Sequence, residues 1–98
     1  MNMQALMRQA QQLQKDMLKE KEAIDEKQFI GKSSIVTAYV KGTKVVEKIE
    51  ISEELSEIDD KELLSDMIIS AINDAMKQID KETEEKMGKY SKGIPGLF

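Results

Sequence analysis

Apolar residues near the start of the chain recur every three or four positions, which is the spacing of one stripe on an α-helix. Six positions form this seam: Met3, Leu6, Ala10, Leu13, Met17 and Ile24. Glu20 is the one charged residue that interrupts the seam, and no Gly or Pro breaks the segment. The pattern therefore predicts a long first helix over residues 1–28, with one apolar face that needs a partner.

The hydrophobic period changes to two after residue 34. Two runs, Ile35–Val40 and Lys44–Ile51, are rich in β-branched residues, and Gly42 between them can take a positive φ in a short turn. We expect an antiparallel hairpin within residues 29–51. Strict alternation would place four residues of the second run on one face: Val45, Glu47, Ile49 and Ile51. The preceding Gln28–Gly31 is a candidate third, short edge strand.

A second long helix is predicted over residues 59–88. Asp59 is its candidate N-cap, with Glu62 in the capping-box position three residues on. Its apolar face is broad and supplies most of the core: Leu64, Met67, Ile68, Ala71, Ile72, Ala75, Met76 and Ile79. Beyond that list the face fades, so we expect the last turns to project from the core and Gly88 to stop the helix.

These elements predict a single α+β domain with the order α-β-β-α. Its parts are a helix (1–28), a hairpin (29–51), a connector (52–58), a helix (59–88) and an irregular tail (89–98). A chain of 98 residues folded in this way leaves much apolar surface uncovered. We therefore expect a homo-oligomer.

The residue types present argue against an enzyme. The chain has no Cys and no His, which removes thiolate ligands and both the commonest general base and the commonest zinc ligand. Asp59 is better explained as a helix cap, and Glu82, Glu84 and Glu85 as a solvated helix face. The turn Lys41–Lys44 lacks the first glycine of a phosphate-binding loop. We expect no catalytic residue, metal, cofactor or small-molecule substrate.

The net charge of −4 is unevenly distributed. Residues 53–85 carry a net charge of −9, whereas residues 31–52 carry +2 and residues 86–98 carry +3. The acidity is thus confined to one segment, which is compatible with a local nucleic-acid footprint on an acidic protein.

Two basic clusters are candidates for that footprint. Three residues of the first helix lie almost above one another at i, i+7 and i+11: Arg8, Lys15 and Lys19. The same face carries amides that can donate to phosphate oxygens: Gln4, Gln11 and Gln12. Near the other chain end stand Lys86, Lys89 and Lys92. Solubility or the helix dipole would explain each cluster alone. At the free ends of two helices in a two-fold dimer, both could contact duplex DNA.

Several short segments, in their order and spacing, carry a family resemblance: Met3–Gln11, Lys48–Ile51, Leu63–Ile68 with Ala71–Ala75, Glu85–Gly88 and Pro95–Phe98. The chain resembles the YbaB/EbfC family of bacterial nucleoid-associated proteins over nearly its full length. The resemblance implies a cytoplasmic, nucleoid-associated homodimer of α-β-β-α protomers, sometimes with an extra strand, whose helices project from the dimer core. It also implies DNA binding with low sequence preference, DNA bending or compaction, and roles in nucleoid organisation or gene regulation.

The family's basic helix ends correspond here to five residues: Arg8, Lys15, Lys19, Lys86 and Lys89. The sequence departs from the family pattern at Gly31–Ser34, which is shorter than the usual glycine-rich approach to the first strand. This departure leaves the strand count open.

Other functions fit parts of the same sequence. The first helix could pack into another protein's coiled coil, which would make the chain an interaction module that ignores DNA. Met3, Met7 and Met17 could form a plastic binding groove, although at this spacing methionines more often belong to a core or dimer interface. A membrane-surface helix is opposed by the Gln-rich face and by the lack of Trp and Phe in residues 3–24. No apolar run could span a membrane and no signal-peptide core is present, so we expect a soluble intracellular protein without a membrane partner.

Overall fold

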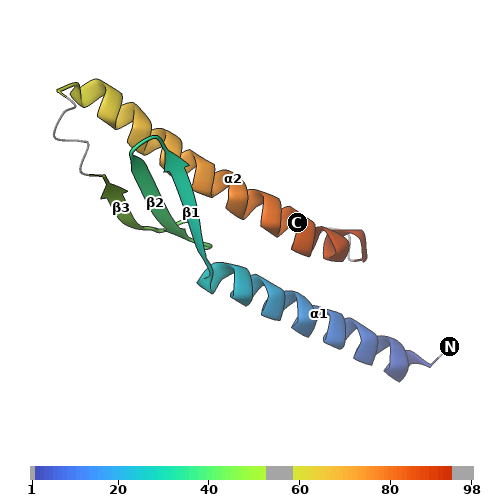
Figure 1. Cartoon of the computed structure of the whole chain (residues 1–98). Helices are drawn as coiled ribbons and strands as arrows, with labels where there is room; N and C mark the ends of the chain where they lie inside the picture. Colours follow the sequence, from blue (N-terminus) through green and yellow to red (C-terminus); the bar gives the residue numbers. More distant parts are fainter. Residues whose placement is uncertain (1, 53–58, 94–98) are drawn as a thin grey trace.

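The computed structural model describes residues 2–52 and 59–93, with side chains described up to Tyr90. Its elements are α1 (Met3–Glu26), β1 (Gln28–Ser33), β2 (Val36–Lys41), β3 (Val46–Ile51) and α2 (Lys61–Gly93). The three strands form one antiparallel sheet in the order β1-β2-β3. Both helices point toward the same end of an elongated molecule, with extents of 70 × 19 × 14 Å (Figure 1). The predicted α+β class is confirmed, and the candidate third strand is present with a full six residues.

The β1–β2 hairpin fixes where the first helix must end. Gln28 pairs with Lys41, so α1 stops at Glu26 and not at residue 28. Ser33 pairs with Val36 at the other end, which leaves a loop of two residues. Ser34, the first of them, has φ 53°, the positive φ that two-residue hairpin loops require.

A bulge in β3 makes the predicted strict alternation wrong. Tyr39 pairs with Lys48 and Val40 pairs with Val46, so Glu47 is the extra residue on β3. Val46 therefore lies opposite the buried Val40, on the face that Glu47 was expected to occupy.

The turn between β2 and β3 uses its glycine for a different reason from the predicted one. Lys44, not Gly42, takes the positive φ, at 70°. A Cβ added at Gly42 would lie only 1.7 Å from the carbonyl oxygen of Ile24. The Gly42 N–H also donates to the Lys27 carbonyl oxygen at 2.9 Å. Gly42 is thus required because the turn packs backbone to backbone against the end of α1.

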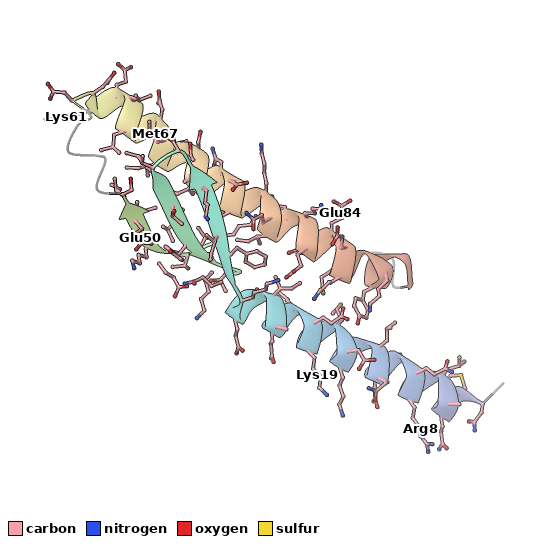
Figure 2. The ribbon with its side chains drawn as sticks, viewed as in Figure 1. Arg8, Lys19, Glu50, Lys61, Met67 and Glu84 are labelled. Carbon is pink, nitrogen blue, oxygen red and sulfur yellow. The ribbon has the colours of Figure 1, made fainter. Side chains whose placement is uncertain are left out.

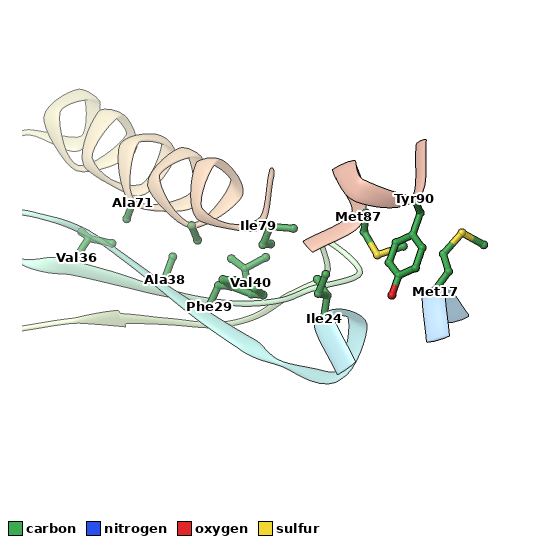
Figure 3. Packing of buried hydrophobic residues seen from close by; sticks show 11 residues of the cluster. Met17, Ile24, Phe29, Val36, Ala38, Val40, Ala71, Ile79, Met87 and Tyr90 are labelled. Atoms are coloured by element: carbon green, nitrogen blue, oxygen red, sulfur yellow. The ribbon is translucent and has the colours of Figure 1, made fainter. Parts of the chain in front are cut away.

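The core lies between α2 and one face of the sheet. Fully buried Val36, Ala38 and Val40 of β2 face a row of small and apolar α2 residues, of which Ala71 and Ala75 are also fully buried (Figure 3). Gly31 of β1 fits under this row so closely that an added Cβ would lie 2.0 Å from the Ala71 carbonyl oxygen. The predicted apolar face of the second helix is confirmed as the main cover of the sheet.

Both ends of α2 differ from the prediction. Asp60, not Asp59, is the N-cap, because its Oδ1 accepts from the N–H groups of Glu62 and Leu63, each at 3.1 Å. This shift moves Glu62 out of the capping-box position. Gly88 lies inside the helix, which continues to Gly93, so the predicted irregular tail begins later. Residues 94–98 of that tail and the connector residues 53–58 lie outside the described residues.

The last turns of α2 do not project from the core, in contrast to the prediction. Met87 and Tyr90 are buried, and they gather with Met17 of α1 in a cluster between the two helices (Figure 3). Apolar residues spaced three apart beyond the acidic run were the signal for this packing.

The apolar seam of α1 divides into a packed and an exposed part. Ile24 and Met17 are buried and Leu13 is half-buried, whereas every residue from 2 to 12 is exposed. Met3 and Met7 are 73% and 60% exposed. We call residues 3–12 of α1 the arm, because they extend beyond the end of α2 (Figure 1).

Candidate nucleic-acid interface

Arg8, Lys15 and Lys19 form what we call the basic stripe of α1. All three side chains are exposed. Arg8 and Lys19 point to the same side, away from α2 (Figure 2). Within residues 2–52 and 59–90, none of the three takes part in an ion pair. The stripe therefore offers uncompensated positive charge over about 16 Å, from the helical rise of 1.5 Å per residue.

The start of α1 adds to this positive potential. Asn2 caps the helix by accepting from the Gln4 N–H at 3.0 Å, and the first turn contains no acidic residue. The first acidic residue in the chain is Asp16. The N-terminal end of a helix dipole is positive, so this end of the molecule favours an anion.

The three predicted glutamines are all exposed on α1, but they are not equivalent. Gln12 donates from Nε2 to Asp16 Oδ1 at 2.9 Å, so its amide already has an acidic partner. Gln4 and Gln11 lie further out and flank Arg8. These two are the better placed for phosphate oxygens.

The lysines predicted near the end of α2 do not belong to the basic stripe. Lys89 donates to Glu20 Oε1 of α1 at 3.1 Å, and Lys86 is exposed beside it. The side chain of Lys92 lies outside the described residues. At 1.5 Å per residue, Glu20 is about 18 Å along α1 from Arg8. Lys89 of α2 thus pairs with Glu20 of α1, whereas Arg8 and Lys19 of the basic stripe point away from α2 (Figure 2).

Ion pairs neutralise several lysines closer to the core. Lys27 binds Glu82 at 2.6 Å and Lys44 binds Asp80 at 3.0 Å. Glu82 is therefore half-buried and paired, and its prediction as part of a solvated face is wrong. Acidic residues of α2 thus pair with Lys27 and Lys44, whereas no ion pair within the described residues involves the basic stripe.

The contact between α1 and α2 shifts two ionisation equilibria. The hydrogen bond to Glu20 raises the pKa of the Lys89 ammonium group above its usual value. Burial raises the pKa of the Tyr90 phenol, and the neighbouring Glu20 carboxylate raises it further.

A second surface, which the sequence analysis did not single out, runs along β3. Side chains of α2 cover the outer edge of β1: Asp74 Oδ2 accepts from the Lys32 N–H at 3.0 Å, and Gln78 Nε2 donates to the Ile30 carbonyl at 2.8 Å. The α2 residues on the opposite flank of that helix, by helical spacing, are apolar. Together with the inward-facing residues of β3 they form the apolar flank: Val46, Ile49, Ile51, Ile68, Ile72 and Met76. Because α2 packs mainly on β1 and β2, the flank is only partly covered.

Two further properties of the described residues concern metal ligation and membrane spanning. The described part of the chain contains no group of residues that could hold a metal ion. In the same part, neither helix is long and apolar enough to cross a membrane.

Comparison with known proteins points to one family. The model described as "YbaB/EbfC DNA-binding family" matches residues 1–94. A nucleoid-associated protein of Enterococcus faecalis is 44% identical over 98 residues, covering 98% of this chain and 94% of the relative. One from Lactococcus lactis subsp. lactis is 43% identical over 97 residues, covering 97% and 98%. A crystal structure of an uncharacterised Helicobacter pylori protein matches with a TM-score of 0.72 at 21% identity, over 92% of this chain and 97% of that one.

Proposed function

The chain belongs to the YbaB/EbfC DNA-binding family, and from this premise we propose that it binds duplex DNA as a nucleoid-associated homodimer, through the basic stripe of α1. The observation that carries the proposal is the uncompensated charge of Arg8, Lys15 and Lys19 on an exposed helix face. The mechanism is electrostatic: each basic side chain that meets a phosphate releases condensed counterions. Such contacts position a protein on DNA without reading base sequence.

Charge and shape both support this mode. Arg8 lies on the exposed arm and points away from α2 (Figure 2). The glutamines Gln4 and Gln11 extend the polar face at the same place. We include Lys86 as a further candidate contact, because it is exposed. Lys92 stays a candidate from the sequence alone.

The homodimer is proposed to form along the apolar flank. Ile49 and Ile51 of β3 are only half-covered, and in residues 2–52 and 59–93 no strand pairs with the outer edge of β3. A second copy that packs its own flank here would bury both sets of apolar residues in an isologous interface. The two basic stripes would then belong to one particle and could engage one duplex.

Duplex binding measured as a function of salt tests the DNA proposal. Six stripe residues in a dimer predict a slope of log K against log salt of about −5 if all reach phosphates. Arg8→Glu with Lys15→Glu should weaken binding roughly tenfold or more at low salt. The matched control is Lys61→Glu with Lys77→Glu, an equal charge change on α2 that should cost much less. Equal losses in both double variants, or no duplex binding by the wild type at low salt, would overturn the proposal.

Light scattering tests the dimer surface. Ile49→Asp should convert the dimer to monomers, because it places a charge in the proposed apolar interface. Ile30→Asp, the same change on an exposed β1 residue, should leave the mass unchanged. If Ile30→Asp dissociates the dimer and Ile49→Asp does not, the interface lies on the outer face of the sheet and not along the apolar flank.

A protein-interaction module remains the alternative function, and one observation favours it. Met3, Leu6 and Met7 are exposed apolar residues on the arm, which could enter another protein's coiled coil. In that case the particle mass would not change when duplex DNA is added, and Leu6→Asp would abolish capture of the partner protein while Arg8→Glu would not.

A further inference from the structure

An ion pair joins α1 to α2 within the packed part of α1. Glu20 Oε1 accepts from Lys89 Nζ at 3.1 Å, and Lys89 Nζ lies 5.1 Å from the centroid of the Tyr90 ring. Tyr90 is only 3% exposed. The second carboxylate oxygen, Glu20 Oε2, is buried and has no hydrogen-bond partner within the described residues.

The position of this contact along α1 allows it to help fix the direction of the helix axis. Nearer the core, α1 is held by Ile24 and by the close approach of Gly42 to its last turn. Two points are needed to fix the direction of a rod, and Glu20 lies about one helical turn, and Met17 about two turns, further out than Ile24. Beyond Leu13 nothing in the described chain touches α1 closely enough to bury it.

We propose that Glu20, Lys89 and Tyr90 act as a latch that fixes the direction of α1, so that they position the basic stripe for DNA instead of contacting DNA themselves. The proposal rests on the DNA binding proposed above. It reassigns Lys89, which the sequence and the family resemblance place among the DNA contacts. The Lys89 ammonium group pairs with Glu20 of α1 at 3.1 Å, whereas Arg8 and Lys19 of the basic stripe point away from α2 (Figure 2).

A single neutralising substitution distinguishes a DNA contact from a latch, because the two roles predict opposite changes in DNA affinity. Glu20→Gln removes a negative charge and frees Lys89. If Lys89 contacts DNA, the affinity of this variant should rise or stay equal. If the latch positions the stripe, affinity should fall about threefold, from the loss of a partly buried ion pair. Glu22→Gln, an exposed carboxylate on the same helix, is the matched control for charge and should bind slightly tighter than the wild type.

A charge swap gives the rescue test. Glu20→Lys and Lys89→Glu should each loosen the helix pair, since each places like charges together. The double variant has the net charge of the wild type and opposite charges restored across the contact. Its affinity should return to within about twofold of the wild type, as a double-mutant cycle measures. Losses that simply add in the double variant would overturn the latch.

The direction of α1 can also be measured without DNA, because the chain contains no cysteine. Spin labels at Gln9→Cys and Lys77→Cys, with labelled protein diluted into unlabelled protein, should give one narrow distance distribution. Glu20→Gln should broaden it and the charge-swapped double variant should narrow it again. An unchanged distribution in Glu20→Gln overturns the latch even if DNA binding holds. Absence of duplex binding by the wild type would overturn the proposed function. The distance measurement would still show whether Glu20 fixes the direction of α1.

Discussion

The arm and the sheet-facing part of α2 are both helical and both carry apolar residues at helical spacing, yet they differ in what those residues meet. On α2, Ala71, Ala75 and Ile79 are buried against the sheet. On the arm, Met3 and Met7 face solvent. Spacing thus determines that a stripe exists, and the rest of the chain determines whether the stripe is covered. Of the basic stripe, Arg8 lies on this uncovered arm, whereas Lys15 and Lys19 lie on the part of α1 whose opposite face is packed.

The largest expected effect tests whether the core region is as tightly packed as the geometry indicates. Gly31→Ala should lower the free energy of unfolding by about 3 kcal/mol, because its Cβ would overlap the backbone of α2 at Ala71 and Ala75. Gly88→Ala is the control, since nothing lies within 4 Å of its added Cβ. That change should raise the free energy of unfolding by about 0.5–1 kcal/mol, because glycine is unfavourable inside a helix. Urea midpoints measure both changes. A Gly31→Ala variant as stable as Gly88→Ala would refute close packing at Gly31.

A methionine pair compares the two parts of α1 directly. Met17→Ala should cost about 2 kcal/mol, because the side chain is 8% exposed among Met87 and Tyr90. Met7→Ala, at 60% exposure, should change the free energy of unfolding by less than about 0.5 kcal/mol. Denaturant unfolding of both variants measures the difference. A large cost for Met7→Ala would mean that the arm is covered in solution, as in a larger assembly.

The two helix caps sharpen the comparison further. Asp60→Ala should cost about 1 kcal/mol, because α2 unfolds together with the core. Asn2→Ala removes a cap of the same kind but should only fray the arm, with no measurable change in global unfolding. Thermal melts give the first value and hydrogen exchange of the α1 amides reveals the second. Asp59→Ala, the cap expected from sequence, should have no effect, and a loss there equal to that of Asp60→Ala would contradict the assigned N-cap.

The smallest effect concerns two tyrosines whose pKa values are raised for different reasons. The hydrogen bond to Glu50 raises the pKa of Tyr39 on the outer sheet face, whereas burial is the main cause at Tyr90. A raised pKa means that the stabilising interaction of the neutral phenol is complete below a tyrosine's usual pKa of about 10 and is lost as pH rises through the higher folded-state value. Ultraviolet absorbance should show that Glu50→Gln lowers the pKa of Tyr39. The pKa of Tyr90 should stay raised in Glu20→Gln, because burial is its main cause. Return of Tyr90 to its usual pKa in Glu20→Gln would assign its shift to charge instead of burial.

Sequence patterns predicted the two helices, the hairpin and the apolar face of α2, because these depend on periodicity within short segments. The same reasoning placed the N-cap at Asp59 and ended α2 at Gly88, since a local start or stop signal is ambiguous by a residue or overridden by packing. The three-residue spacing of Met87 and Tyr90 marks an apolar face, but the partner that buries Tyr90 depends on where α1 lies. The bulge at Glu47 likewise depends on how β3 pairs with β2.

The candidate site divides along the same line. The alignment of Arg8, Lys15 and Lys19 follows from helix geometry alone, and their exposure agrees with it. The engagement of Lys89 with Glu20 needed the relative placement of two helices that are far apart in sequence. The DNA-contact roles that the family resemblance implies for Lys86 and Lys89 of α2 therefore stay predictions, and Lys89 already has an acidic partner.

Because the contact between Gly42 and Ile24 holds α1 near one end, a small rotation there would produce a large displacement at the other end. Arg8 lies sixteen residues from Ile24, or about 24 Å along the axis, so a rotation of about 10° at that pivot would move Arg8 by about 4 Å. That displacement is comparable to the axial step of about 3.4 Å between neighbouring phosphates on one DNA strand. An added Cβ at position 42 would lie 1.7 Å from the Ile24 carbonyl oxygen, so the turn or α1 must shift to admit it. If α1 is the element that rotates, the displacement at Arg8 would be about one phosphate step.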